Sequence, residues 1–518
     1  MRALLQKEKL CREDKAFLFF RLGGWEKEGK KNRRGGRYGG NGWTAKTQGL
    51  LQIKAGPPVF RVVHLTGRSE SLPEAPVRKI LERSAVLFVS VLEMGLLASC
   101  GSTSIPGQPG GGTSPQTKYL AVADTGNNRI LIYDAPFTTG QSAGLVLGQP
   151  DFGQATFSLG TSTASAMTPM GMAVDAMGDL FVADIEHCRV LEFQPPFTTD
   201  MNASVVFGQS TFTQGSSGVC ETSDQFHPPS PALASGLDAP IAVAIDSQGD
   251  LWVADYYGTR ILEYVPPFSN DMTASIAIGQ PNLDTTSVCD GDPSGVYPPP
   301  SASTLCYPSD IDFDAKGDLW VADWLNARVL EFTPPFSTGM SASLEIGQPV
   351  ATAFTSAADC NDNGGRAVSA SCLAPGSLAF DSAGNLWLVD QYNERVLEFS
   401  PPFTTGMSAS AVLGQPDFTT GALQAPAANT FDFEDEFDGF EGGVWIDPGG
   451  DMYVADSGNS RVLLFHPPLT SGMGATMVIG QPNMTTGTPI LSADGCAAPS
   501  ANNLCYPERV LTFDEPAE

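Results

Sequence analysis

One phrase that recurs six times constrains this 518-residue chain more than any other feature. In each copy an Asp follows two apolar residues, and an Arg follows the Asp after four variable residues. A Gly-Gln pair starts 24 residues after every Asp, and all variation in length falls between that pair and the next Asp. The copies are Asp124/Arg129, Asp184/Arg189, Asp255/Arg260, Asp323/Arg328, Asp390/Arg395 and Asp456/Arg461, with the glycines Gly148, Gly208, Gly279, Gly347, Gly414 and Gly480. Such regularity indicates a repeat architecture.

Each unit contains four short segments that are typical of β-strands. In the second unit they are Met172–Asp175, Leu180–Ala183, Arg189–Phe193 and Ala203–Phe207. A tight turn with Gly178 separates the first two, and Pro195-Pro196 ends the third because proline cannot donate to a ladder. Four antiparallel strands repeated six times, with no helical period between them, predict an all-β six-bladed propeller. A solenoid is the alternative architecture.

The two ends of the repeat region predict a closed ring. The first unit starts at Lys118 and lacks its first strand. The C-terminal segment Leu504–Asp514 parallels Leu305–Asp314, which leads into the fourth unit. We therefore expect Val510–Phe513 to pair with Leu120–Ala123, so that the last segment completes the first blade and leaves no open edge.

Together these motifs resemble the NHL repeats of bacterial proteins. The resemblance lies in Gly-Gln-Pro, in Asp-x-x-Gly-Asp-Leu-Trp-Val-Ala-Asp and in Asn-x-Arg-Val-Leu-Glu-Phe, and it covers residues 118–518. It implies a six-bladed propeller. It does not imply a single activity, because function within such a fold is diverse.

Charge divides the chain sharply. Residues 1–99 hold 19 Lys and Arg against 9 Asp and Glu, whereas residues 100–518 hold 10 against 48, a net charge of −38. So acidic a domain repels phosphate backbones, which argues against nucleic acid as its partner.

The segment before the repeats resembles an export signal. A charged start at Val77, an apolar stretch and Leu97-Ala98-Ser99-Cys100 make residues 77–99 similar to a bacterial lipoprotein signal, which implies a lipid on Cys100. An ordinary cleaved signal is the alternative. Residues 1–76 are then either the result of a misassigned gene start or a basic disordered extension. Residues 100–117 are predicted to form a flexible tether. These features predict an exported protein of the bacterial cell envelope, facing the periplasm or the exterior.

Eight cysteines follow Cys100, and their positions predict four disulfides. Three pairs each lie within one link between units, and the remaining two cysteines should share a face. The predicted bridges are Cys188–Cys220, Cys289–Cys306, Cys360–Cys372 and Cys496–Cys505. They would fasten loops that lack a core of their own, in an oxidising compartment. Zinc is the alternative, although no Cys-x-x-Cys occurs.

Two acidic links between units are candidate calcium sites. The first resembles half of a calcium loop but has Ala370 where a bidentate Glu is expected; the second is the densest acidic run. Their ligands would be Asp359, Asn361 and Asn363, and Asp432, Glu434, Glu436 and Asp438. A solvated acidic loop is the alternative. The histidines His187, His227 and His466 suggest the three-His zinc site of the peptide α-amidating lyase, but His466 should lie near the opposite face.

The functional prediction rests on which loops share a face. In a propeller, the turn between the second and third strands and the link between blades lie on the same side, which is the default binding face. We expect the six Asp–Arg pairs to brace these loops, and the Asn found three residues after the Asp in four units to suit a left-handed turn. The predicted function is a monomeric binding or scaffold module for a protein, peptide or glycan at the cell surface. A metal-dependent lyase or lactone hydrolase using the central channel is the alternative.

Overall fold

The structure is a computed structural model. It describes residues 9–12, 15–18, 50–51, 65–66, 118–156, 163–213, 234–285, 300–350, 353–354, 366–433, 442–487 and 498–514. The chain divides into two units, Met1–Gly111 and Gly112–Glu518. In the first unit, β1 (Lys9–Arg12) pairs with β2 (Lys15–Leu18), and β3 (Leu50–Leu51) pairs with β4 (Leu65–Thr66), both antiparallel.

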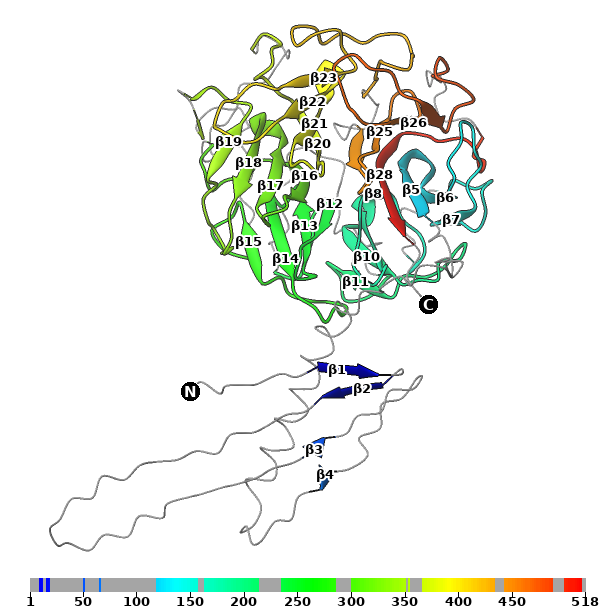
Figure 1. Ribbon diagram of the computed structural model, residues 1–518, viewed down its shortest axis with the longest axis vertical. Helices are drawn as coiled ribbons and strands as arrows, with labels where there is room; N and C mark the ends of the chain where they lie inside the picture. Colours follow the sequence, from blue (N-terminus) through cyan, green and yellow to red (C-terminus); the bar gives the residue numbers. More distant parts are fainter. Residues whose placement is uncertain are drawn as a thin grey trace, which may run out of the picture. The chain divides into compact units, whose positions relative to one another are not determined.

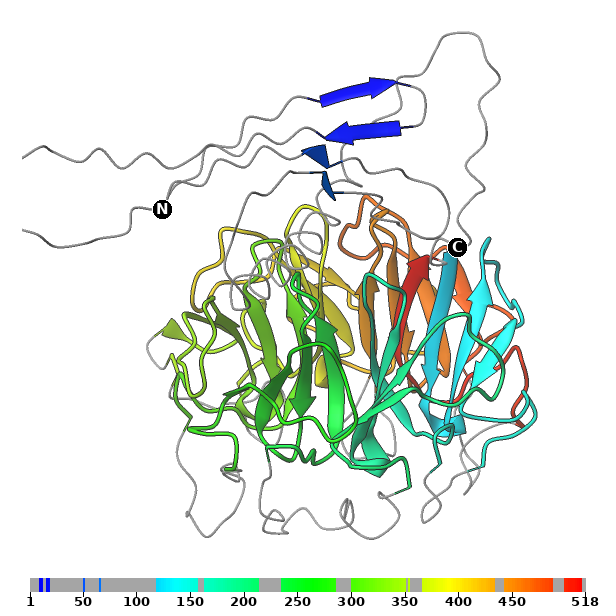
Figure 2. The ribbon, with the colours of Figure 1, turned by 90° about the horizontal axis from the view of Figure 1, so that it is seen from below.

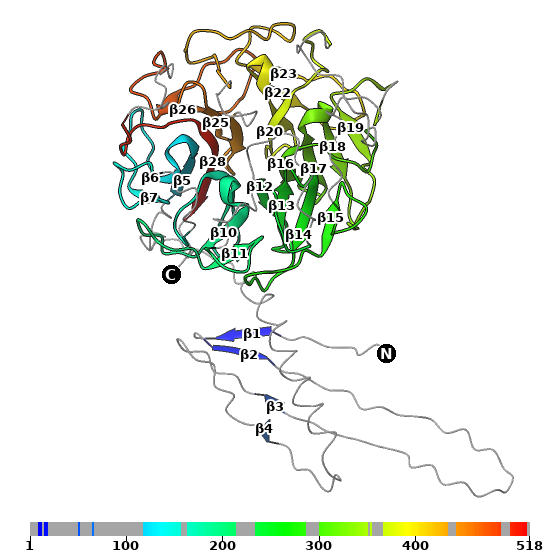
Figure 3. The same cartoon turned by 180° about the vertical axis from the view of Figure 1, so that it is seen from behind.

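The second unit is a six-bladed propeller of four-stranded antiparallel sheets (Figure 1, and from behind in Figure 3). Blade 1 consists of β28 (Pro507–Asp514), β5 (Lys118–Asp124), β6 (Arg129–Asp134) and β7 (Leu145–Leu147). Blade 2 consists of β8 (Pro169–Val174), β9 (Leu180–Asp184), β10 (Arg189–Phe193) and β11 (Val205–Phe207). Blade 3 consists of β12 (Pro240–Ile245), β13 (Leu251–Asp255), β14 (Arg260–Tyr264) and β15 (Ile276–Ile278).

The other three blades repeat this order of strands. Blade 4 consists of β16 (Pro308–Phe313), β17 (Leu319–Asp323), β18 (Arg328–Phe332) and β19 (Leu344–Ile346). Blade 5 consists of β20 (Pro375–Phe380), β21 (Leu386–Asp390), β22 (Arg395–Phe399) and β23 (Ala411–Leu413). Blade 6 consists of β24 (Gly443–Ile446), β25 (Met452–Asp456), β26 (Arg461–Phe465) and β27 (Met477–Ile479).

The ring closes as the sequence predicts. β28 pairs antiparallel with β5, which places Val510 opposite Val122 and Phe513 opposite Tyr119. The red C-terminal strand therefore lies beside the cyan strand that begins the repeat region (Figure 1). The C-terminal segment supplies the strand that the first unit lacks.

The predicted strand limits in blade 2 are partly wrong. Its first strand begins at Pro169, three residues before the expected Met172, and its fourth begins at Val205 instead of Ala203. The later start has a clear cause, because the Ala203 N–H donates to the Ala164 carbonyl in the link before the blade. Ladder pairing with the third strand can begin only after that residue.

Two kinds of loop share one face of the propeller. The strands of each blade run along the ring axis (Figure 2), and successive strands are antiparallel. The turn between the second and third strands therefore lies on the same side as the link to the next blade. We call this side the loop-rich face. In blades 1, 2, 4 and 5 the turn is a short 3₁₀ segment: η2 (Thr125–Asn127), η3 (Ile185–His187), η5 (Trp324–Asn326) and η7 (Gln391–Asn393).

The fixed spacing of 24 residues between Asp and Gly-Gln has a structural reason. In every blade the Gln side chain after the fourth strand donates its amide N–H to a carbonyl in the turn between strands two and three. In blade 4, Gln348 Nε2 lies 2.8 Å from the Ala327 carbonyl oxygen. The preceding Gly347 has a φ of +107° and lies against that same carbonyl, so a side chain there would clash. Inserting a residue between the turn and the fourth strand would break this contact.

Apolar packing between neighbouring blades forms the core. The fully buried Trp320 of β17 packs edge-on against Phe380 and Phe403 of blade 5, with ring centroids 5.6 and 4.8 Å apart. Trp252 of blade 3 makes the same contacts with Phe313 and Phe336 of blade 4. Each blade thus buries its apolar face against the next one. Among the residues that the structure describes, no helix is long and apolar enough to cross a membrane.

Candidate functional site

The six Asp–Arg pairs form buried ion pairs at the corners between the second and third strands. In each pair the Arg Nε donates to the Asp Oδ2 at 2.5 to 2.7 Å, and both side chains are almost completely buried. The other Asp oxygen accepts a backbone N–H from the link that leads into the blade. In blade 5, Asp390 Oδ1 accepts the N–H of Ala374 at 2.7 Å. We call each of these pairs a corner brace.

The guanidinium group of each corner brace also ties together two segments of the loop-rich face. In blade 5, Arg395 donates through Nη2 to the carbonyls of Ser369 and Cys372, which precede the blade. It donates through Nη1 to the Phe418 carbonyl, which follows the blade, at 2.7 Å. Blades 1, 2, 3 and 6 have the same Nη1 contact 23 residues after their Arg. The braces therefore fix the loops that surround any binding site on this face.

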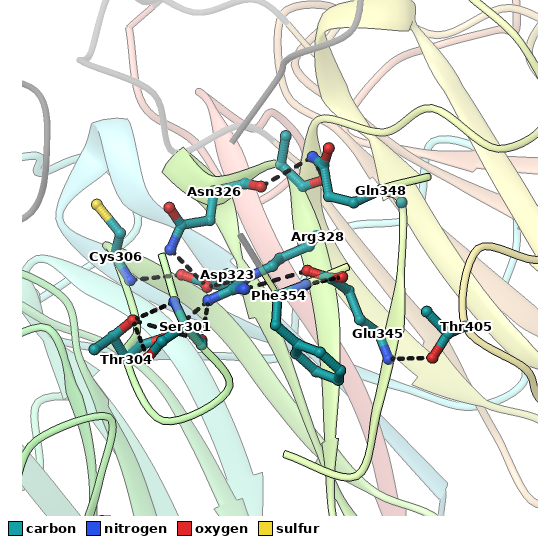
Figure 4. A network of polar contacts seen from close by, with 12 residues as sticks. Ser301, Thr304, Cys306, Asp323, Asn326, Arg328, Glu345, Gln348, Phe354 and Thr405 are labelled. Atoms are coloured by element: carbon teal, nitrogen blue, oxygen red, sulfur yellow. Dashed lines mark hydrogen bonds and ion pairs between the residues drawn. The ribbon is translucent and has the colours of Figure 1, made fainter. Parts of the chain in front are cut away.

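Blade 4 departs from this pattern (Figure 4). Here Arg328 Nη1 donates to a side chain, that of Glu345, at 3.2 Å. Glu345 lies in the middle of β19, is fully buried, and accepts the Phe354 N–H at 2.6 Å through its other oxygen. Glu345 thus gives the Arg328 guanidinium a second carboxylate partner besides Asp323.

Burial and ion pairing act in opposite directions on the brace carboxyls. For Asp124, Asp255, Asp323 and Asp456, burial raises the pKa, and the paired Arg only partly offsets this. At Asp184 burial also raises the pKa, but Arg189 and His187 together bring it below the ordinary value.

The role expected for the brace asparagines is wrong. The left-handed residue is the fourth after the Asp, not the third. It is Asn128, Cys188, Thr259, Ala327, Glu394 or Ser460, with φ between +50° and +54°. The Asn at the third position instead donates its side-chain amide to the Asp, at 2.9 Å from Asn127 to Asp124. In blade 2, His187 takes this place, with Nδ1 2.7 Å from Asp184 Oδ1. Gly258 occupies it in blade 3.

The central channel is lined by the first strand of every blade, and one level of it is strongly asymmetric. In blades 1, 3, 4 and 6 the residue at this level pairs, in the antiparallel register, with the residue just before the brace Asp. In blades 2 and 5 it is the second residue after the proline that begins the strand. The residues at this level are Gly171, Ala242, Asp310, Ser377, Gly443 and Arg509. Four are small, and the two charged ones come from opposite blades, 4 and 1.

Arg509 reaches across the ring at this level. It donates through Nη1 to the Gly442 carbonyl at 2.7 Å and through Nη2 to the Ser309 carbonyl at 3.2 Å, and its Nε lies 3.9 Å from Asp310 Oδ2. A Cβ added to Gly443 would lie 3.0 Å from the Arg509 side chain, so the small residues leave room for it. The guanidinium thus places a fixed positive charge in the middle of the channel.

Carboxylate and hydroxyl groups of the channel accept hydrogen bonds from backbone N–H groups of neighbouring blades. Asp310 Oδ2 accepts the Leu378 N–H of the next blade at 3.0 Å, and Ser377 Oγ accepts the Val444 N–H at 3.2 Å. Glu508 likewise accepts the Gly442 N–H at 3.0 Å. For the half-buried Asp312, on the same side of β16 as Asp310, burial raises the pKa to about 7, with help from the Asp310 charge. These groups are occupied in holding the ring together.

A cluster of aromatic side chains spans three blades on the loop-rich face. It consists of Tyr256, Tyr257, Tyr307, Trp324 and Tyr392, and we call it the aromatic cluster. Tyr256 stacks on Tyr307 with centroids 4.8 Å apart and an interplanar angle of 17°. Trp324 contacts rings of two blades, because its ring centroid lies 6.3 Å from that of Tyr307 and 6.4 Å from that of Tyr392. Tyr256 is buried, and the other four are half-buried.

Asp238 is an acidic residue whose backbone contacts the backbone of this cluster. Its carbonyl accepts the Tyr257 N–H at 3.1 Å, and its own N–H donates to the brace carboxylate of Asp255. Burial and the charge of Asp255 raise its pKa to about 7, although Arg260 acts in the other direction. The sequence reasoning missed both features. The available signal was that an aromatic residue stands among the two residues after the brace Asp only in blades 3, 4 and 5.

Several predicted site residues lie outside the described part of the chain. These are Cys100, Cys220, Cys289, Cys360, Cys496, His227, Asp359, Asn361, Asn363, Glu434, Glu436 and Asp438. Cys188, Cys306, Cys372 and Cys505 are each disulfide-bonded, but their partners are not among the described residues, so the four pairings stay predictions. The Asp432 N–H donates to the brace carboxylate of Asp456. The described residues contain no group of three His, Cys, Asp or Glu side chains that could hold a metal ion.

Comparison with known proteins gives remote structural likenesses that cover about 70 % of this chain. No family model matches it, and no curated protein matches it in sequence. Among solved structures it is similar to virginiamycin B lyase from Staphylococcus aureus, at 12 % identity over 70 % of this chain and 85 % of that one, with a TM-score of 0.33. It is also similar to a chain of the nidogen/laminin complex, at 14 % over 70 % and 93 %, with a TM-score of 0.37.

A third likeness is to a gluconolactonase from Xanthomonas campestris, at 13 % identity over 72 % of this chain and 90 % of that one, with a TM-score of 0.31. These neighbours include a lyase, a lactonase and a member of a binding complex. Likenesses this remote do not assign an activity, and the resemblance to NHL repeats stays a prediction.

Proposed function

We propose that this propeller is an exported binding module whose loop-rich face holds its ligand. The aromatic cluster carries the proposal. Four half-buried rings from three blades lie together on this face, whereas aromatic side chains that serve only the core are normally buried. The corner braces hold the surrounding loops in fixed positions, so little ordering is needed when a ligand binds.

The residues that line the central channel favour ligand binding at the loop-rich face over catalysis inside the channel. Arg509 brings a cation to the level where a channel metal would need anionic ligands, and Asp310 and Glu508 are already bound to backbone amides. A metal-dependent lyase or lactone hydrolase, the alternative function, gains no support from this arrangement.

Location outside the cytoplasm belongs to the same proposal. It is supported by the lipoprotein-like segment that ends at Cys100 and by the four disulfide-bonded cysteines of the propeller. Mass spectrometry of the protein from its native membrane would test it. We expect a diacylglycerol-modified peptide that begins at Cys100. Peptides from residues 1–76 would contradict Cys100 as the first residue of the mature protein.

Binding at the face can be tested on peptide and glycan arrays. Wild-type protein would be compared with a Trp324→Leu/Tyr392→Leu variant, which removes two half-buried rings but keeps apolar bulk. Phe403→Leu is the matched control, because Phe403 is half-buried in a turn between the third and fourth strands, on the opposite face. We expect ligands that the wild type and the control bind and the double variant loses. Ligands that bind all three equally would refute the loop-rich face as the site.

A further inference from the structure

The few basic residues of the propeller are almost all used inside it. Residues 100–518 contain ten Lys and Arg. Six are the buried brace arginines and one is Arg509, which is buried in the channel. Of the other three, Lys118 pairs with Asp447, Lys316 with Asp314, and Arg366 donates to the carbonyls of Gly347 and Ser371. Among these ten, Lys316 alone has a mostly exposed side chain, at 71 %.

The exterior is therefore more uniformly acidic than the composition suggests. The propeller carries 48 Asp and Glu, and seven of the ten groups that could neutralise them are buried. Such a surface attracts cations over a distance of about one Debye length, roughly 8 Å at physiological ionic strength. A cationic partner would approach quickly, whereas an acidic one would be repelled.

The aromatic cluster has the local chemistry to hold a cation once it arrives. Tyr and Trp rings attract Lys and Arg side chains through the negative potential of their faces, within about 6 Å of the ring centre. The Trp324 and Tyr392 rings are steeply inclined to each other, with an interplanar angle of 66°, and the Tyr257 and Tyr307 rings are nearly perpendicular, at 85°. Rings that are steeply inclined to each other can form two walls of a cage, which a stack of parallel rings cannot do. Asp238, whose backbone carbonyl accepts the Tyr257 N–H, brings a carboxyl group into the segment that adjoins the cluster.

From these observations we propose that the aromatic cluster and Asp238 capture Lys or Arg side chains from a basic peptide segment of a protein partner. The inference rests on the proposed function and adds the chemical class of the ligand. Uncharged peptides and glycans stacked on the same rings are the competing occupants. The overall charge favours the basic peptide over both, because neither gains from the acidic field.

Matched peptides test this without changing the protein. The probes are a fluorescent peptide of alternating Lys and Gly, the same peptide with every lysine acetylated, and a Glu version, each titrated in fluorescence anisotropy. We expect the Lys peptide to bind at least about tenfold more tightly than the acetylated one, and its affinity to fall with added salt. Equal binding of the Lys and acetylated peptides would overturn the inference.

Protein variants then locate the binding. Trp324→Leu and Tyr392→Leu should each weaken Lys-peptide binding about three- to fivefold, and Phe403→Leu should leave it unchanged. Thermal unfolding of each variant separates lost folding from lost contacts. If acetylated peptides or glycans bind through the cluster and Lys peptides do not, the cationic ligand is wrong but the binding face stands. If no probe depends on Trp324 or Tyr392, the proposed function fails as well.

Discussion

Two sets of residues are neighbours at the turn between the second and third strands of every blade. One set is the same in all six blades, and the other varies. The brace Asp and Arg are identical in all six blades and fully buried. The two residues directly after the Asp differ from blade to blade. They are Thr125-Gly126, Ile185-Glu186, Tyr256-Tyr257, Trp324-Leu325, Gln391-Tyr392 and Ser457-Gly458.

This contrast separates the fold from the candidate function. A residue that recurs in every repeat serves the geometry that every repeat shares. A position that varies, and that brings aromatic rings together from only three neighbouring blades, is free to serve a ligand. Positions of the second kind depend on the first, because the corner braces fix the loops on which they stand.

Breaking one corner brace should have the largest effect. Arg395→Met leaves Asp390 as an unpaired buried charge and frees three backbone carbonyls, so we expect the free energy of unfolding to fall by about 3–5 kcal/mol. Urea denaturation followed by circular dichroism measures this. A loss below about 1 kcal/mol would mean that the braces are not the residues that hold the face together.

Removing the positive charge at the channel centre should lower the free energy of unfolding by a smaller amount. Arg509→Met loses three hydrogen bonds to backbone carbonyls, but Asp310 keeps its bond to the Leu378 N–H. We expect a loss of about 1–3 kcal/mol in the same denaturation experiment, with ligand binding at the face intact. Loss of binding in a variant that is still folded would show that the channel belongs to the site.

Asp312 allows the channel to be tested by pH. Its folded pKa of about 7 lies above the ordinary value, so the folded protein holds this proton more tightly than the unfolded chain does. The group therefore makes the protein less stable as pH rises from about 4 to 7. Asp312→Asn removes the penalty and should stabilise the protein by about 1–3 kcal/mol at pH 8, and by almost nothing at pH 4. An equal gain at both pH values would rule out titration as the cause.

The smallest expected effect is the pH dependence of binding. Asp238 has a pKa of about 7, set by its burial and by Asp255 against Arg260, with the uncharged Tyr257 beside it. It is mostly ionised at pH 8 and mostly protonated at pH 6, so a Lys peptide should bind about threefold more tightly at pH 8. Asp238→Asn should bind with the weaker affinity at both pH values. A pH dependence that survives this substitution would have to come from another group.

The ring and its closure could be predicted from the sequence because they depend on what the repeats share. The spacing from Asp to Gly-Gln and the likeness of Leu504–Asp514 to Leu305–Asp314 were sufficient. The role of Asn127 was misassigned because the same residue type suits a left-handed turn and a side-chain hydrogen bond, and only the backbone angles separate the two.

The candidate site was harder to predict for the opposite reason. Tyr307 precedes blade 4, Tyr256 belongs to blade 3 and Tyr392 to blade 5, and nothing in their spacing shows that the rings meet. The position of Arg509 in the channel also depends on ring closure, since β28 must first lie opposite β16. Contacts between blades follow from the assembled ring and not from any one repeat.

Hydrogen–deuterium exchange with and without the Lys peptide tests the central claim most directly. The account predicts slower exchange at the turns after Asp255, Asp323 and Asp390 and in the segment around Asp238 when the peptide is bound. It predicts no change at the corresponding turns of blades 6 and 1. Protection confined to the opposite face, or spread equally over all six blades, would contradict a binding site at the aromatic cluster.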